Sequence, residues 1–143
     1  MIAQKAKGLG KKDRVDEFGE YWIELGRLIM KSKKKVGRCF SCSGIAVYTL
    51  VKEREHDNWV ILVVGNPSRD HYFVLVGASL EAIRAKDGYV IDIWDGNLCG
   101  TPPVHPIKGF KYMDKHVIPC CIIMPEDREK LRAFIRDRES DAD

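Results

Sequence analysis

Apolar residues in the first part of the chain recur at three- and four-residue steps, the spacing of one face of a helix. Between Val15 and Met30 this spacing predicts an amphipathic helix whose apolar positions are Phe18, Tyr21, Trp22, Leu25, Leu28 and Ile29. The basic run from Lys31 to Lys35 suits a helix C-terminus, and we interpret it as a solvated face. Residues 1–14 offer few side chains to bury, so we expect a flexible lead-in there.

The next apolar segment, from Ile45 to Leu50, is apolar on nearly all sides. This pattern is typical of a central helix rather than a surface helix. Gly37 allows a tight backbone turn before it. Ser41 and Ser43 are small polar residues that suit a helix start. The pattern therefore predicts a buried helix with Cys39 at its beginning.

Three short segments rich in β-branched residues predict strands: Trp59 to Val64, His71 to Val76 and Tyr89 to Trp94. Turn residues separate the first two of these segments. Between the second and the third, the segment from Ser79 to Lys86 predicts a short helix with Ser79 as its N-cap.

The last third of the chain begins with Leu98 to Asp114, a proline-containing segment that we expect to form an irregular surface loop. The apolar segment from His116 to Met124 predicts a final strand, and Pro119 indicates an edge position or a bulge. Pro125 opens a final helix, whose core face is formed by Leu131, Phe134 and Ile135. We expect residues 139–143 to be a frayed acidic tail.

This order of elements predicts an α+β fold, with N-terminal helices packed on a small, mainly antiparallel sheet. A chain of 143 residues fits one domain, which we assign to residues 15–138. The charge is only mildly basic, with 24 Lys and Arg against 21 Asp and Glu, and no basic stripe is interleaved with aromatic residues. We therefore expect no nucleic-acid partner. No apolar run has the length of a membrane helix, so we expect no membrane partner either.

The five cysteines include the adjacent pair Cys120-Cys121, and their odd number does not resemble a disulfide framework. A reducing compartment is therefore the expected place of action. The lysine-containing N-terminus lacks the apolar region of a secretory signal peptide.

Cys39, His71 and Asp92 are the candidate catalytic residues. A thiol at a helix N-terminus has a lowered pKa because the helix dipole stabilises the thiolate. If the strands of His71 and Asp92 are antiparallel neighbours, the start of one lies beside the end of the other, where the two side chains can meet. Asp92 would then orient the imidazole, and His71 would pair with the thiolate and later protonate the leaving amine. The backbone N–H of Cys39 would form half of an oxyanion hole.

Other assignments compete with this one. Cys42 is a second candidate nucleophile, one turn further into the helix, where the dipole acts less strongly. His105 and Asp95 are alternative candidates for the base and the orienting acid. Cys39 and Cys42 with Cys120 and Cys121 could bind zinc, although adjacent cysteines chelate poorly. A redox role for the Cys-x-x-Cys pair lacks the expected βαβ context, and Cys120 and Cys121 are most simply core residues.

Three blocks of the sequence resemble the signature of papain-like bacterial effector and toxin domains. Their residues are Gly37-x-Cys39 at the first helix, Asp70-His71 followed by an aliphatic strand and Gly77, and Asp92-x-Trp94. The chain has Ser41 and Ile93 where that family has an acidic residue and a proline. The likeness covers roughly Gly37 to Gly96 and implies a papain-like fold.

The resemblance implies that Cys39 is the nucleophile, His71 the base and Asp92 the orienting acid, with Arg38 and Trp94 near the oxyanion hole or lining the site. It implies a glutamine deamidase or a thiol protease, and deamidation of a host protein is our first hypothesis. The expected enzyme is a monomer without metal or cofactor, secreted by a Sec-independent route and acting in the host cytoplasm. A hypothesis of another class is a non-catalytic binding module on the same scaffold.

Overall fold

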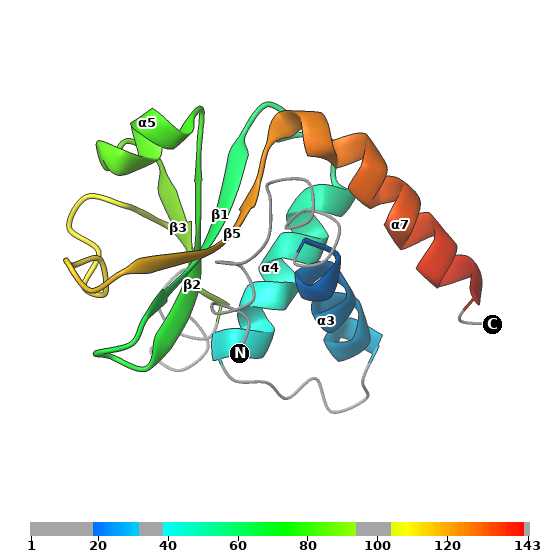
Figure 1. Ribbon diagram of the computed structural model, residues 1–143, viewed down its shortest axis with the longest axis horizontal. Coiled ribbons are helices and arrows are strands. Elements are labelled where there is room, and N and C mark those ends of the chain that lie inside the picture. The colour runs from blue at the N-terminus through cyan, green and yellow to red at the C-terminus, as the bar shows by residue number, and fades with distance from the viewer. Residues whose placement is uncertain (1–18, 32–38, 94–103, 142–143) are drawn as a thin grey trace.

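The computed structural model describes residues 19–31, 39–93 and 104–141, which form an α+β fold (Figure 1). Within these residues there are four α-helices and a short 3₁₀ helix: α3 (Glu20–Lys31), α4 (Cys39–Lys52), α5 (Leu80–Arg84), η2 (Pro125–Asp127) and α7 (Arg128–Asp141). The strands are β1 (Val60–Asn66), β2 (His71–Gly77), β3 (Tyr89–Ile91), β4 (Val104–Pro106) and β5 (Ile118–Ile123).

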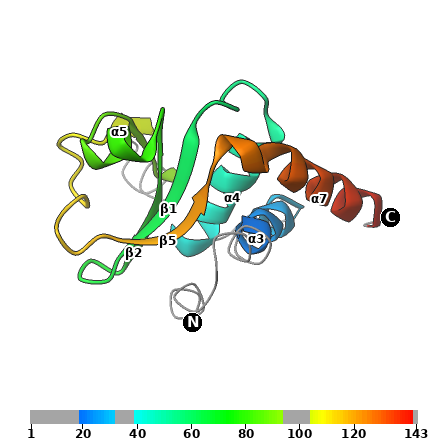
Figure 2. The ribbon, with the colours of Figure 1, turned by 45° about the horizontal axis from the view of Figure 1, so that its top comes forward.

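The five strands form one antiparallel sheet in the order β4-β3-β2-β1-β5. Helices α3, α4 and α7 lie on one side of this sheet, and α5 lies on the other with the segment between β4 and β5 (Figures 1 and 2). Since successive strand residues point to opposite faces, the sheet supports a separate apolar cluster on each side. The first cluster includes Val47, Val74 and Val76, and the second includes Phe73 and Leu75.

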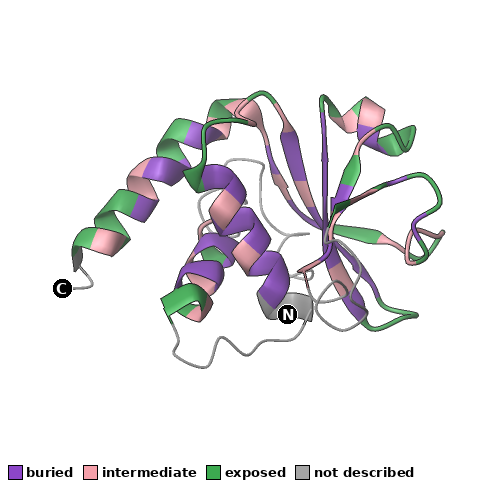
Figure 3. Ribbon diagram, turned by 180° about the vertical axis from the view of Figure 1, so that it is seen from behind, coloured by how far each residue is buried: buried purple, intermediate pink, exposed green. Residues whose placement is uncertain are grey.

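Helix α4 is the central helix, and Figure 3 shows that it is buried along nearly all of its described length. It crosses α3 at two glycines, where a Cβ atom on Gly26 would lie 2.0 Å from the carbonyl oxygen of Gly44. Only a residue without a side chain permits this close approach of two backbones. The crossing thereby fixes the position of α4 against α3.

Helix α7 is attached to the rest of the fold by its arginines. The guanidinium of Arg132 donates two hydrogen bonds to Asp57, at 2.7 and 2.9 Å, and one to the Val51 carbonyl at 3.2 Å. The Arg128 guanidinium donates to the carbonyls of His56 and Trp59. Further along, Glu139 accepts hydrogen bonds from Tyr48 and Lys52.

The structure confirms most of the predicted elements. Ser79 caps α5 with a side chain that accepts from the Ala82 N–H at 3.0 Å. Pro119 lies in an edge strand, where the pairing of β1 with β5 shifts by one residue between Val63 and Val64. This irregularity explains how the adjacent Cys120 and Cys121 both belong to the cluster on the α4 side.

Two predictions were wrong. The segment from Leu98 to Asp114 is not wholly irregular, because β4 pairs with β3 from Val104 to Pro106. A strand of three residues is too short to give a clear alternating pattern. Helix α7 continues to Asp141, three residues into the predicted frayed tail at 139–143, because Glu139 is held by Tyr48 and Lys52. The predicted lead-in, residues 1–14, lies outside the described residues.

Among the described residues, no helix combines the length and the apolar character needed to cross a membrane.

Candidate active site

A buried histidine–carboxylate pair lies at one end of the sheet. The Nε2 atom of His71 lies 2.5 Å from Oδ2 of Asp92. His71 is 3% exposed and Asp92 is 2% exposed, so little water reaches the contact. A buried carboxylate and a buried imidazole each need a hydrogen-bond partner, and here each provides one for the other.

The pair results from the antiparallel pairing of β2 with β3. His71 is the first residue of β2, and Asp92 follows the last residue of β3. The strands pair through Val74–Ile91 and Val76–Tyr89, which brings the start of β2 beside the end of β3. The contact predicted from the order of these two residues is therefore present.

Aromatic rings surround the imidazole. The Tyr112 ring lies 4.2 Å from the His71 ring, centroid to centroid, and the Phe73 ring stacks on His71 at 5.8 Å. Phe110 contacts both Phe73 and Tyr112. Because these rings are apolar, the hydrogen bond between His71 and Asp92 lies in a region of low polarity.

The imidazole lies on the sheet face opposite to α4. Along β2, His71 shares its face with Phe73 and Leu75, whereas Val74 and Val76 pack towards α4. Helix α4 begins at Cys39, but the Cys39 side chain lies outside the side chains that the structure describes. The structure thus brings His71 and Asp92 together and gives the position of the helix start that carries the third candidate.

A cavity of about 230 Å³ reaches His71 at the rim of the sheet. Its lining includes Asn66 and His71 from one face of the sheet, together with Tyr72 and Cys120, which pack with the cluster on the α4 side. The cavity therefore lies where the two faces meet. The first turn of α4 is at the same end of the molecule as the turn between β1 and β2 (Figure 1).

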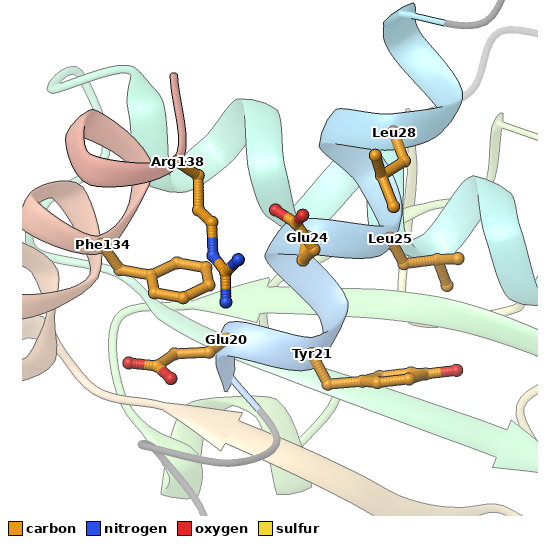
Figure 4. A pocket seen from close by; sticks show the side chains of 7 residues that line it. All are labelled: Glu20, Tyr21, Glu24, Leu25, Leu28, Phe134 and Arg138. Carbon is orange, nitrogen blue, oxygen red and sulfur yellow. The ribbon is translucent and has the colours of Figure 1, made fainter. Parts of the chain in front are cut away.

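A larger cavity, of about 420 Å³, lies between α3 and α7 (Figure 4). Tyr21, Leu25 and Leu28 of α3 line it on one side, and Phe134 and Arg138 of α7 line it on the other. The carboxylates of Glu20 and Glu24 also lie here, but neither the His71–Asp92 pair nor any of the described thiols lines it. Size alone does not make this cavity the catalytic site.

The described thiols do not favour the competing assignments. Cys42, Cys120 and Cys121 are all buried. Burial raises the pKa of the Cys120 thiol to about 11, which keeps it protonated at neutral pH although it lines the cavity at His71. Among the side chains that the structure describes, no cluster could hold a metal ion.

The alternative base, His105, lies in β4 and pairs with Val90 across the ladder. Its ring lies 5.4 Å from that of Phe110, and its Nε2 atom is buried without a hydrogen-bond partner. Of these two candidate bases, His71 is the one that contacts a carboxylate. The alternative acid Asp95, and the predicted site-lining residues Arg38 and Trp94, lie outside the described residues.

Sequence reasoning missed two residues of the site, Asn66 and Tyr112. Asn66 stands opposite His71 in the pairing of β1 with β2, and its amide donates to the Tyr112 carbonyl at 2.8 Å. The polar Asn66 at the end of an apolar strand was a usable signal, because a polar residue on a buried face needs partners. No local pattern marked Tyr112, which belongs to a segment without regular structure.

Comparison of the chain with protein-family models, with curated protein sequences and with solved structures finds no match.

Proposed function

We propose that the protein is a cysteine-dependent amidohydrolase with a papain-like arrangement, in which Cys39 is the nucleophile, His71 the base and Asp92 the orienting acid. The observation that carries this proposal is the buried contact of 2.5 Å between His71 and Asp92. Such a contact fixes the tautomer and the orientation of an imidazole. Because Asp92 binds Nε2, the proton exchanged with the thiol is carried on Nδ1.

The reaction follows from these roles. The Cys39 thiolate attacks the carbonyl carbon of an amide, and backbone N–H groups at the start of α4 stabilise the negative oxygen. The C–N bond then breaks, and the leaving nitrogen takes the proton held on His71. Water attacks the resulting thioester while His71 accepts its proton, which releases a carboxylic acid and regenerates the thiolate.

The size of the cavity favours a side-chain amide as the substrate. A volume of about 230 Å³ at His71 is smaller than the roughly 300–1,000 Å³ of pockets that enclose a drug-sized ligand. It suits one extended side chain better than a length of peptide backbone. We therefore propose glutamine deamidation of a host protein as the reaction, ahead of peptide cleavage.

A second candidate is a non-catalytic binding module on the same scaffold. It is favoured by one observation, the position of the His71 ring on the sheet face away from α4. In this alternative, the His71–Asp92 pair supports the end of the sheet and the cavity binds a ligand without covalent chemistry.

Incubation with a eukaryotic cell lysate tests the reaction. Wild type and Cys39→Ala are each incubated, and mass spectrometry then searches for Gln-to-Glu conversion and for new peptide N-termini. We expect Gln-to-Glu conversion with wild type alone. New N-termini with wild type alone would replace deamidation with proteolysis, and identical lysates after both incubations would contradict hydrolase activity.

A further inference from the structure

The segment that follows β4 is hydrogen-bonded to Asn66, the residue that pairs with His71 across the sheet. Asn66 at the end of β1 is 1% exposed. Its Nδ2 atom donates to the Tyr112 carbonyl at 2.8 Å and to Oδ1 of Asp114 at 3.1 Å. One buried amide therefore binds this segment at two points.

The amide is itself held in place. The Ser68 hydroxyl donates to Oδ1 of Asn66 at 2.9 Å, which leaves Nδ2 directed at the segment. On the other side, Oδ1 of Asp114 also accepts from the backbone N–H of His116 at 2.8 Å. Each group in this network has a hydrogen-bond partner, a condition under which buried polar networks fix a single geometry.

The consequence of this attachment is the position of the Tyr112 ring. Its centroid lies 4.2 Å from the His71 centroid, and Phe110 packs against it at 5.6 Å. Two cations lie near the same ring, the Arg69 guanidinium at 5.8 Å and the Lys111 ammonium at 5.1 Å from its centroid. The Tyr112 ring thus contacts His71 and also has two cations nearby, Arg69 from the turn between β1 and β2 and Lys111 from the segment after β4.

We propose that Asn66 is a positioning residue: by binding the backbone at Tyr112, it holds the Tyr112 ring over His71 and excludes water from the His71–Asp92 hydrogen bond. This effect is exerted through the imidazole, and neither Asn66 nor Tyr112 takes part in bond making. Its importance for catalysis rests on the proposed function, but its effect on the hydrogen bond does not.

Nuclear magnetic resonance tests the effect on the hydrogen bond without requiring activity. A proton between a buried imidazole and a carboxylate exchanges slowly with water only while water is excluded. We expect a resolved His71 Nε2–H signal in wild type and Tyr112→Phe, and its loss through exchange in Tyr112→Ala and Asn66→Asp. Asn66→Asp keeps the side-chain shape but removes both donated bonds.

Two controls separate this role from general support of the fold. Ser68→Ala removes only the bond to Oδ1 and is expected to retain the signal. The dispersed backbone spectrum of each variant shows whether it is folded. A folded Asn66→Asp or Tyr112→Ala variant that keeps the Nε2–H signal as slowly exchanging as wild type would overturn the proposal.

The reactivity of Cys39 towards iodoacetamide supplies the second measurement. We expect the alkylation rate of Cys39 to fall about ten- to hundredfold in Asn66→Asp, since a misplacement of about 1 Å has effects of this size. In Tyr112→Phe, which keeps the ring, we expect the rate to stay near that of wild type. If wild-type Cys39 is unreactive but the Nε2–H signal behaves as expected, the proposed function fails and the positioning role stands. If Cys39 is reactive and neither measurement changes in Asn66→Asp, the positioning role fails alone.

Discussion

His71 and Asp92 depend on each other at the level of single residues. Removing one member takes a buried hydrogen-bond partner from the other, and the burial of both makes replacement of that partner by water difficult. We expect Asp92→Ala to lower the free energy of unfolding by about 3 kcal/mol, measured by urea denaturation.

Asp87→Ala is the matched control for this substitution. Asp87 lies two residues before β3, and Asp92 lies directly after it. Unlike Asp92, Asp87 is exposed. Exposed substitutions generally change stability by less than about 0.5 kcal/mol. Equal unfolding midpoints for Asp92→Ala and Asp87→Ala would show that the buried contact contributes nothing to the fold.

Individual residues also show how far the sequence could predict the site. His71 and Asp92 could be paired because His71 begins one strand and Asp92 directly follows the next strand along the chain. Asn66 and Tyr112 are separated by 46 positions, and only the folded chain brings them together. The face of the sheet that α4 covers is also set only by folding. Alternation along the strand placed His71 on the same face as Phe73, but it could not state whether α4 packs on that face or on the other.

At the level of elements, the crossing of α3 and α4 depends on two glycines, and Gly26 is the more tightly enclosed of the two. A Cβ atom on Gly26 would lie 2.0 Å from a backbone oxygen and 2.4 Å from a backbone carbon of Gly44. Backbone atoms cannot rotate away as a flexible side chain can, so the helices must separate. We expect Gly26→Ala to lower the thermal unfolding midpoint, with a loss of about 1–3 kcal/mol in stability.

Gly19→Ala is the control for the crossing. A Cβ atom there would lie 3.5 Å from the nearest side-chain atom of Leu131, an ordinary van der Waals distance. Its unfolding midpoint should stay at or above that of wild type, because alanine has the lower backbone entropy when unfolded. A Gly26→Ala variant as stable as Gly19→Ala would contradict the close crossing.

The contact between Arg132 of α7 and Asp57 makes the stability of the fold depend on pH in the acid range. Hydrogen bonds from Arg132 hold the pKa of Asp57 below its ordinary value. A carboxylate with a lowered folded pKa stabilises the fold above its unfolded pKa, near about 3.9, and loses that contribution as the pH falls through the folded value.

We expect Asp57→Asn to be less stable than wild type at neutral pH, and the difference in unfolding free energy to shrink as the pH falls below about 4. Urea denaturation of both proteins across this pH range measures it. Glu55→Ala, which removes an exposed carboxylate two residues earlier, is the control for the loss of a surface charge in this segment. A wild-type advantage that persists unchanged at about pH 3 would contradict the assigned role of Asp57.

For the whole molecule, hydrophobic periodicity predicted the α+β class and most of the elements, because a sheet with two apolar faces requires long apolar segments. It did not predict β4, whose three residues are too few to show a period. It also did not predict the continuation of α7, because its last turn is held by Tyr48 and Lys52, both about 90 positions earlier.

The central claim concerns the whole molecule, since Cys39 begins a helix on one side of the sheet and the His71 ring lies on the other. The proposed triad requires the thiol and the imidazole to meet at the rim, at the cavity that joins the two faces. His105 provides the control, as a second histidine on the same side of the sheet as His71.

The pH dependence of Cys39 alkylation by iodoacetamide tests this claim most directly, in wild type, His71→Ala and His105→Ala. Mass spectrometry follows each cysteine separately, with buried Cys120 as the slow internal reference. In wild type and His105→Ala, we expect the midpoint of the alkylation rate against pH to lie well below the pKa of a free thiol, which is about 8.5. In His71→Ala we expect a higher midpoint. A wild-type midpoint near that of a free thiol, unchanged in His71→Ala, would contradict the catalytic pair and favour the binding module.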